Sequence, residues 1–446
     1  MRLFAALSLL FLGSSTNICL ASSADDPAKP GNTQPETQHI FGDWGGLRTS
    51  LATKGIDLSL GYIGQLAANV SGGKRAGFDY AQQLEFKADF DWGKIANLSG
   101  FSTHAIFVNR LGRNLSSDYI GDNVFQAQSM YGGGGNVVVH LAELYGEQAF
   151  LGGKVDVAAG RLLVGEDYAT SPLYCDFMST AVCGYPNSLA AKAGFTTFPN
   201  STWGARVRVA ALEHLYVQAG AYQVRPEAGG NTGLNWGWSG TTGTYYPFEV
   251  GYEPAYGSSR LNGHYKLGFV HDTSNYPDLL EDENGLAFAE TGNPAAMHNG
   301  RNSLYFLADQ MLYRSGQKPE DGLILLGGFV SSDKSTSQFS RFAFFGLTDQ
   351  GIIASRPDDS FGVLVAWQEV SDALAATQAL QAANGMPLEK SAQGIQSHES
   401  LIEARYNIAV SPGLAIMPDV QYVVHPDAAR VLPNSVVVGI QMKANL

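Results

Sequence analysis

The sequence lacks long apolar runs, is poor in cysteine and has fewer basic than acidic residues. Apart from an apolar run over 3–12, nothing approaches the ~20 apolar residues that a membrane-spanning helix needs, which excludes a helical membrane protein. Three cysteines in 446 residues are too few for a disulfide-rich scaffold. With 28 Lys and Arg against 41 Asp and Glu, the formal charge of −13 argues against nucleic acid as a partner.

Motifs for catalysis and for cofactor binding are also missing. The nine histidines are scattered, without an HExxH pattern or ligand-like spacing. The glycine run 132–135 lacks the strand-to-helix context of a phosphate-binding loop. The acidic run 281–283 is typical of a solvated loop, with a site for calcium or lipopolysaccharide-bound cations as the alternative. The sequence therefore predicts neither an enzyme nor a cofactor.

The N-terminus is typical of an exported protein. Arg2, the apolar run 3–12 and the small residues near Ala21 together form a cleavable signal peptide over 1–21. Residues 22–40 are polar and rich in Pro, Gln and Thr, so we expect a disordered leader. Residues 41–55 are expected to form a short helical segment ahead of the main domain, 56–446.

Two cysteines remain after signal cleavage, Cys175 and Cys183, close together in a polar loop that contains proline. In an oxidising compartment a disulfide between them is the default expectation. A metal clip is the alternative, but neither the spacing nor nearby histidines favour it.

Apolar and polar residues alternate along much of the chain. In 56–62 and again in 84–92, one face is apolar or aromatic and the other is small, polar or charged. A period of two is typical of strands and not of helices. About sixteen such runs are found, at 56–70, 81–92, 100–110, 136–151, 154–163, 202–212, 215–225, 245–252, 263–272, 301–314, 321–332, 339–349, 360–370, 398–410, 414–424 and 433–446.

The connections between these runs alternate in length. Those after odd-numbered strands are often long (111–135, 164–201, 226–244, 273–300 and 371–397), and those after even-numbered strands are short (152–153, 213–214 and 411–413). A transmembrane barrel has this asymmetry, with short periplasmic turns and long external loops, whereas a propeller or sandwich has no reason for it. Helix formers over 370–383 predict a helix within one external loop.

The charged face decides which way the barrel is turned. Glu85, Lys87, Asp89 and Asp91 share one face of a single strand, and burying them unpaired would cost several kcal/mol each. Sixteen strands enclose a lumen too wide for side chains to fill. We therefore predict an all-β fold, a transmembrane antiparallel β-barrel with charges facing a wet lumen and apolar residues facing lipid. The last strand fits, although it ends on Leu446 and not on the usual terminal aromatic.

A series of short motifs runs in order along nearly the whole mature chain. They are FGDWGGLR (41–48), GRL (160–162), GED (165–167), SPLYC (171–175), WGARVR (203–208), GHYKLG (263–268), RPDDSFG (356–362) and PDVQY (418–422). The series resembles the carbohydrate-selective porins of the OprB type. The resemblance implies a sixteen-stranded outer-membrane barrel that passively admits glucose-like sugars to a Gram-negative periplasm.

The expected partners follow from this resemblance and from the barrel. They are small sugars, outer-membrane lipid and lipopolysaccharide, and the barrel assembly machinery; whether the barrels form a homotrimer stays open. A general porin without sugar preference is one alternative. A secreted all-β carbohydrate-binding protein or hydrolase is another, because a catalytic carboxylate pair leaves no fixed sequence pattern.

A sugar-preferring pore needs donors and acceptors for hydroxyl groups at a narrow point, with weak binding. Arg206 and Arg208 share the polar face of the sixth predicted strand, and Glu143 and Glu147 share that of the fourth. Only one strand separates them, so we hypothesise that they face each other across a constriction. Ordinary solvated lumen charge is the alternative for all four.

Further candidates are less well placed by the pattern. Alternation puts Arg161 on the apolar face unless a bulge turns it inward, and Arg110 ends its strand near the mouth. Trp236 and Trp238 could stack a sugar at the entrance, or could be interfacial or loop-packing aromatics. The loop 164–201, which holds both cysteines, is the best candidate for an inward-folded loop that narrows the pore.

Overall fold

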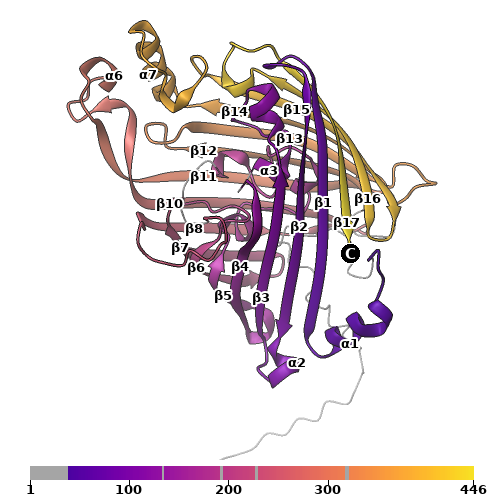
Figure 1. The fold of residues 1–446 in the computed structure, drawn as a ribbon. Coiled ribbons are helices and arrows are strands. Elements are labelled where there is room, and N and C mark those ends of the chain that lie inside the picture. The colour runs from indigo at the N-terminus through magenta and orange to yellow at the C-terminus, as the bar shows by residue number, and fades with distance from the viewer. Residues whose placement is uncertain (1–38, 133–134, 191–193, 227–229, 317–320) are drawn as a thin grey trace, which may run out of the picture.

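The computed structural model describes residues 39–132, 135–190, 194–226, 230–316 and 321–446. The predicted signal peptide, and the predicted leader up to residue 38, lie outside this part of the chain. The described residues contain seventeen strands, and sixteen of them form a closed antiparallel ring in chain order (Figure 1). The predicted barrel is confirmed.

All sixteen predicted strands are present, and several are longer than the alternation indicated. The ring strands are β1 (Ile56–Ser71), β2 (Gly77–Asp91), β3 (Phe101–Gly112), β4 (Val137–Phe150), β5 (Val155–Leu162), β6 (Thr202–Leu212), β7 (Leu215–Val224), β8 (Gly243–Tyr252), β10 (Leu261–Asp282), β11 (Ala295–Arg314), β12 (Gly322–Ser332), β13 (Phe339–Gln350), β14 (Ser360–Val370), β15 (His398–Ser411), β16 (Leu414–Val424) and β17 (Ser435–Asn445). The seventeenth, β9 (Ala255–Tyr256), pairs with β10 only.

The ring closes where the first strand meets the last. Leu66 of β1 lies opposite Ile440 of β17, and both side chains are about half exposed, at 46% and 52%. Their neighbours Gln65 and Gln441 point inward and are buried. The pleat therefore sorts apolar side chains to the outside and polar ones to the lumen, as the alternation predicts.

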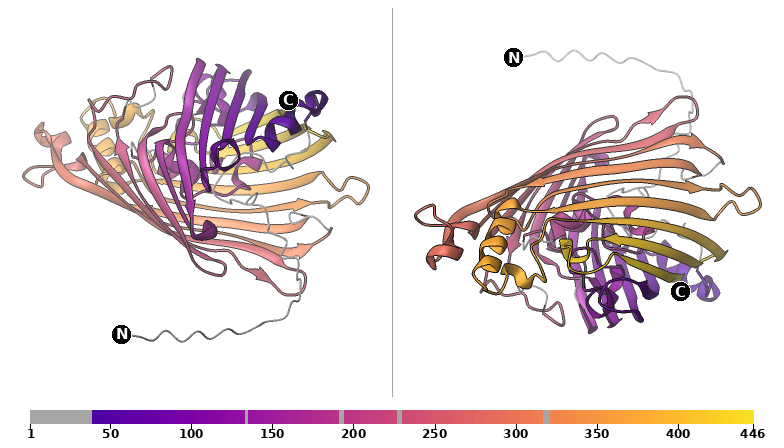
Figure 2. Two further views of the ribbon diagram at one scale, coloured as in Figure 1. Left: turned by 90° about the horizontal axis from the view of Figure 1, so that it is seen from below. Right: turned by 90° about the horizontal axis from the view of Figure 1, so that it is seen from above.

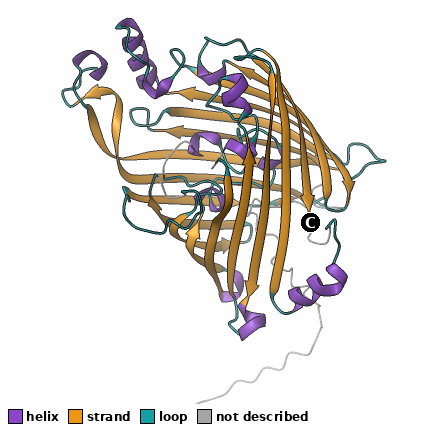
Figure 3. Cartoon of the chain, in the orientation of Figure 1, coloured by secondary structure: helices purple, strands orange, loops and turns teal. Residues whose placement is uncertain are grey.

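Short turns join the strands at one rim and long segments join them at the other (Figure 3). One expected long loop, 273–300, differs from the prediction. Most of it is strand, because β10 and β11 extend beyond the barrel as a paired arm. The arm lies outside the barrel wall, so neither of its faces needs apolar residues for contact with lipid. Its residues are mostly charged and polar, and they lack the alternation from which the other strands were predicted.

Helices are short and lie at the two rims or within the lumen. They are α1 (Leu47–Thr53), α2 (Trp92–Ala96), α3 (Ser129–Gly132), α4 (Val164–Asp167), α5 (Asn187–Ala190), α6 (Phe288–Thr291) and α7 (Asp372–Ala383), with single turns η1 (Trp44–Gly46), η2 (Ser116–Ile120), η3 (Leu151–Gly153), η4 (Tyr174–Asp176), η5 (Glu389–Ser391) and η6 (Pro426–Ala428). The predicted helical segment 41–55 contains η1 and α1, and the predicted helix over 370–383 corresponds to α7. In the part of the chain described above, no helix combines the length and the apolar character needed to cross a bilayer.

The N-terminal segment is attached to the end of the last strand. Arg48 of α1 donates to the backbone oxygen of Leu446 at 2.8 Å and to that of Leu58 at 3.0 Å. The backbone amide of Ile40 donates to the oxygen of Asn445 at 2.8 Å. Both chain ends described here thus meet at the short-turn rim, with the C-terminus beside α1 (Figures 1 and 2).

Candidate functional site

The described residues 163–190 and 194–201, between β5 and β6, fold into the barrel. Tyr174 is buried and packs edge-on against Phe344 of β13, with ring centroids 5.3 Å apart. Gly362 of β14 makes room for Arg405 and for this loop, because a Cβ there would lie 2.7 Å from Nε of Arg405 and 3.2 Å from Cζ of Phe177. The loop that the sequence analysis selected as a pore-narrowing element therefore lies in the lumen.

Charged side chains of the wall hold the backbone of this lumen loop in place. They come from β8, β10, β15 and β17, which are spread around the ring, so the loop is fixed across the lumen and not along one side. The contacts are Glu249 with the Ala169 amide (3.0 Å), Lys266 with the Thr170 oxygen (2.6 Å), Glu403 with the Met178 and Ser179 amides (2.6 and 3.1 Å), and Lys443 with the Cys175 oxygen (2.9 Å).

The connection between β3 and β4 also folds inward, beside the first lumen loop. The amide of Ser129 donates to the oxygen of Met178, and that of Thr180 donates to the oxygen of Gln126, both at 2.9 Å. Gln65 of β1 accepts from the amide of Met130 at 3.1 Å. The sequence predicts an external loop here, and no signal in its residues distinguishes it from an inward-folded one.

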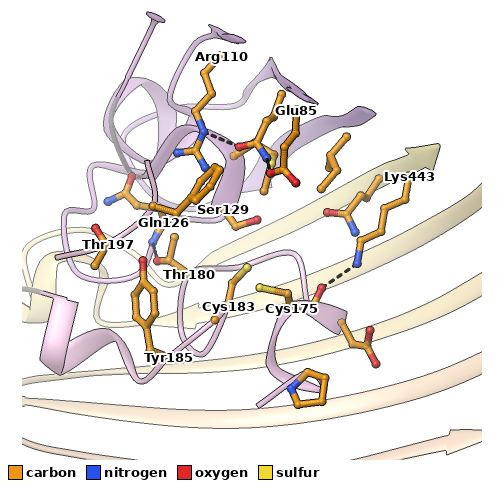
Figure 4. A pocket seen from close by; sticks show the side chains of 18 of the residues that line it. Glu85, Arg110, Gln126, Ser129, Cys175, Thr180, Cys183, Tyr185, Thr197 and Lys443 are labelled. Atoms are coloured by element: carbon orange, nitrogen blue, oxygen red, sulfur yellow. Dashed lines mark hydrogen bonds between the residues drawn. The ribbon is translucent and has the colours of Figure 1, made fainter. Parts of the chain in front are cut away.

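The two loops leave a cavity of about 400 Å³ against one side of the wall. Its wall residues come from β1 to β3 and from β13 and β15 to β17, so the cavity lies beside the strands where the ring closes. The opposite inner wall is covered by the apolar packing of the lumen loop. The polar and aromatic side chains that line the cavity include Gln83, Glu85, Lys87, Arg110, Gln126, Ser129, Thr180, Tyr185, Thr197, Phe198, Arg405 and Lys443 (Figure 4).

Positive and negative groups alternate around this cavity. Nζ of Lys87 lies 3.1 Å from Oε1 of Glu85, and the guanidinium of Arg405 lies 3.3 Å from Oδ2 of Asp176. Burial raises the pKa of Tyr185, so its hydroxyl stays protonated and can both donate and accept a hydrogen bond. The cavity therefore offers many donors and acceptors with little net charge.

Arg110 lies beside Glu85 among the polar side chains that line the cavity (Figure 4). Its Nε donates to Oε1 of Gln83 at 2.6 Å, and its guanidinium lies 5.1 Å from the ring centroid of Phe198. The side chain belongs to β3 and points into the lumen, not outward at the mouth. It places a planar set of donors next to an aromatic ring, and a sugar presents hydroxyl edges and apolar faces to match.

Arg206 has a different environment from the one that the sequence analysis expected. It is 3% exposed and contacts three carboxylates: Glu147 of β4 at 2.9 Å, Asp167 of α4 at 2.7 Å, and Asp156 of β5. The expected contact between Arg206 and Glu147 is present. However, Arg206 also contacts Asp167 and so ties the wall to the start of the lumen loop, and it does not line the cavity.

Arg208 and Glu143 do not face each other. Arg208 stacks on Tyr216 at 3.8 Å and lies 3.4 Å from Glu253, close to the short-turn rim. Glu143 accepts from the amide of Leu163 at 3.1 Å. A register shift in β4 beside Glu143 and the position of Arg208 near the turn keep the two side chains apart, and neither lines the cavity.

Arg161 does not line the lumen either. It lies opposite Leu144 of β4 and Trp203 of β6, and Leu144 is 40% exposed on the outer surface. The alternation of β5 is therefore not interrupted at this point. The Arg161 guanidinium is buried on the outer side, where it donates to the backbone oxygen of Ser201.

Trp236, one of the two candidate entrance aromatics, packs against Trp203 of β6. Nε1 of Trp203 donates to the oxygen of Trp236 at 2.9 Å, and the two rings pack edge-on with centroids 6.0 Å apart. Trp238 is 66% exposed. Trp236 therefore packs its loop against β6, and the alternative of loop packing holds for it.

The cysteine pair is brought together, but as free thiols. Cys175 and Cys183 both line the cavity, and their side chains lie next to each other (Figure 4). The predicted proximity is confirmed, whereas the predicted disulfide is not present in the structure. The hydrogen bond between the thiols raises the pKa of Cys175 and lowers that of Cys183.

Comparison with known proteins places this geometry in a family. A family model described as "Carbohydrate-selective porin, OprB family" matches residues 75–446. The chain belongs to the OprB family. It is 30% identical to Porin B of Pseudomonas aeruginosa over 98% of this chain and 95% of that protein. It is also 24% identical to the putative porin QuiX of Acinetobacter baylyi, over 92% and 93% of the two chains.

A solved OprB-family structure shares the architecture. The high-pH structure of Pseudomonas putida OprB superposes with a TM-score of 0.85 at 28% identity, over 93% of this chain and all of that one. The family resemblance stated from sequence motifs is thereby confirmed, together with the outer-membrane porin fold.

Proposed function

We propose that the chain is an outer-membrane channel for the passive diffusion of small carbohydrates into the periplasm. The observation that carries the proposal is the cavity itself, in which charged groups of both signs, hydroxyls, amides and an aromatic ring line the open side of a closed porin barrel. A neutral, hydroxyl-covered solute gains hydrogen bonds there, whereas an ion meets no uniform field. The OprB family and Porin B support the carbohydrate class.

Within this cavity we assign sugar contacts to Arg110, Glu85, Gln126 and Tyr185, with Phe198 as the stacking surface. Arg110 would donate to adjacent hydroxyls, Glu85 would accept, and the amide and phenol would do both. Arg110 and Glu85 already have protein partners, so a sugar replaces existing hydrogen bonds there and binds weakly, whereas Oε1 of Gln126 has no partner among the described residues and can be met by a sugar hydroxyl. Weak binding is what a channel requires, because a tightly held solute would block it.

Among the earlier candidates, Arg206 and Glu147 are assigned to positioning of the lumen loop. Arg208 and Glu143 become structural charges of the wall, and Arg161 belongs to the outer side. The outward apolar side chains also disfavour the alternative of a secreted soluble carbohydrate-binding protein or hydrolase, since such a protein would expose them to water.

For export and assembly, we propose that residues 1–21 are removed as a signal peptide and that the barrel assembly machinery inserts the mature chain. N-terminal sequencing of the protein from outer membranes would test the cleavage; an intact Met1 would contradict it. Native mass spectrometry in detergent decides between a monomer and a homotrimer.

Arg110 offers the sharpest test of the sugar site. In liposome swelling, Arg110→Ala should reduce the preference for glucose over an uncharged amino acid of similar size, without lowering the rate for the amino acid. Arg208→Ala is the matched control, because it removes a lumen arginine outside the cavity, and it should leave the preference unchanged. If Arg208→Ala loses the preference for glucose and Arg110→Ala keeps it, Arg110 is not part of the sugar site.

A further inference from the structure

Two buried acidic side chains connect the second lumen loop to the external rim. Asp122, in the connection between β3 and β4, accepts from the amides of Val124 (2.7 Å) and Asp427 (3.2 Å). Glu399, at the outer end of β15, accepts from the next amide in each of the same two segments, Phe125 and Ala428, both at 3.3 Å. The two carboxyl groups thus lie side by side, and both link the connection between β3 and β4 to the connection between β16 and β17.

The same two carboxyl groups also lie within hydrogen-bonding reach of each other. Both residues are fully buried, and Oδ2 of Asp122 has no hydrogen bond to a donor. Two carboxylates cannot form a hydrogen bond unless one of them carries a proton. Two like charges at this distance in a buried site would repel strongly, so the arrangement requires a shared proton.

Other charged groups around the pair do not replace that proton. Asp427, from the loop between β16 and β17, adds a third acidic group, held by Asn123 at 3.3 Å. Lys74, which follows β1, acts on Asp427 from a distance and donates to the oxygen of Ser117 at 3.0 Å. The neighbourhood is therefore more acidic than basic.

We propose that Asp122 and Glu399 form a proton-sharing latch that docks the loop residues 113–132 against the external rim, and that the loop loosens when the latch loses its proton. Gln126, Ser129 and Met130 of this loop line the cavity, so its docking sets the width of the pore at that point. The proposal concerns the loop and holds for any solute that the channel carries.

The direction of the pH dependence follows from Asp122. Burial raises its pKa from 3.8 to about 6 in the docked loop. The docked state therefore holds a proton that a released loop would give up. Docking is fully favoured below the ordinary pKa of the Asp122 carboxyl group and weakens as the pH rises above it and the pair gives up its protons in turn. Each unit of pKa difference corresponds to a tenfold change in the ratio of docked to released loop.

Hydrogen exchange and conductance test the latch in the full-length reconstituted protein. The Asp122→Asn variant keeps an acceptor for Val124 and supplies the donor that the shared proton provides. At pH 8, the amides of Val124 and Phe125 should exchange at least tenfold more slowly in Asp122→Asn than in the wild type, and the difference should close as the pH falls toward 4. Wild-type single-channel conductance should rise or become noisier between pH 5 and 8, and that of the variant should stay flat.

Two further variants complete the comparison. Glu399→Gln neutralises the other carboxyl group of the pair, the one on the barrel wall. It provides the same test if the Asp122→Asn variant does not assemble. Asp118→Asn is the matched control, since Asp118 lies in the same loop but pairs with the exposed Arg113; its pH profile should follow the wild type. Equal exchange at pH 8 in the wild type and both neutralised variants, or an unchanged pH profile in them, would overturn the proposal.

Discussion

Replacing Arg206 should release the lumen loop and widen the channel. In Arg206→Ala, the carboxylates of Glu147, Asp156 and Asp167 lose their common cation while remaining in a buried site. Removing one partner of a buried ion pair costs about 3–5 kcal/mol. Asp167 keeps the hydroxyl of Tyr222 at 2.8 Å, so we expect the lower end of that range.

Most of this cost can be relieved by moving the loop, because Asp167 belongs to the loop whereas Glu147 and Asp156 belong to the wall. About 3 kcal/mol corresponds to roughly a hundredfold shift toward the undocked loop. The expected result is a higher and noisier single-channel conductance and faster liposome swelling with oligosaccharides larger than glucose. Arg208→Ala serves as the control, and heat-modifiable migration in a detergent gel verifies that the barrel is folded. A folded Arg206→Ala channel with wild-type conductance and an unchanged size limit would refute this reasoning.

Two further predictions concern the wall and the turns. Glu403→Ala leaves the backbone amides of Met178 and Ser179 without their hydrogen-bond acceptor, which costs about 1–3 kcal/mol for each amide. The noise of the single-channel conductance should therefore increase. Glu403→Gln keeps an acceptor oxygen and should give the wild-type conductance trace. In the turn between β13 and β14, hydrogen bonds from Arg356 hold the pKa of Asp359 below its ordinary value of 3.8. The ionised Asp359 therefore stabilises the fold above pH 3.8, and this stabilisation is lost as the pH falls below 3.8. Asp359→Asn should therefore lower the Tm in detergent at pH 7 and have little effect at pH 2; an equal drop at both pH values would argue against a charged role for Asp359.

The strands were predictable because each one has an inside and an outside. Alternation such as Gln65 next to Leu66 is imposed by lipid on one face and the lumen on the other, and it needs no knowledge of distant residues. The arm of β10 and β11 was missed over 273–282 and 295–300 because it leaves the membrane and loses that constraint.

The functional site was less predictable, because it depends on which segments fold inward. Gln126, Ser129, Tyr185 and Phe198 belong to loops, and their position is set by wall contacts far away in the sequence. One signal was available in retrospect: interior glycines such as Gly362 and Gly439 stand where an inward loop approaches the wall closely. The identity of the approaching loop could not be read from them.

The candidate arginines show the same limit. Arg110 and Arg206 both face inward as alternation requires, but only Arg110 reaches the cavity, since Arg206 is covered by a loop acid. Alternation fixes the face of a residue and says nothing about its partners. Charge complementarity between two strands, here Arg206 and Glu147, correctly predicted a contact but not its burial.

Comparison of liposome swelling rates for glucose and for uncharged amino acids of similar size is the most direct measurement of the central claim. A sugar-preferring channel should admit glucose at least several-fold faster than an amino acid of equal size, and this preference should fall in Arg110→Ala. Equal rates for the two solutes in the wild-type protein would contradict the sugar selectivity and leave a general diffusion porin.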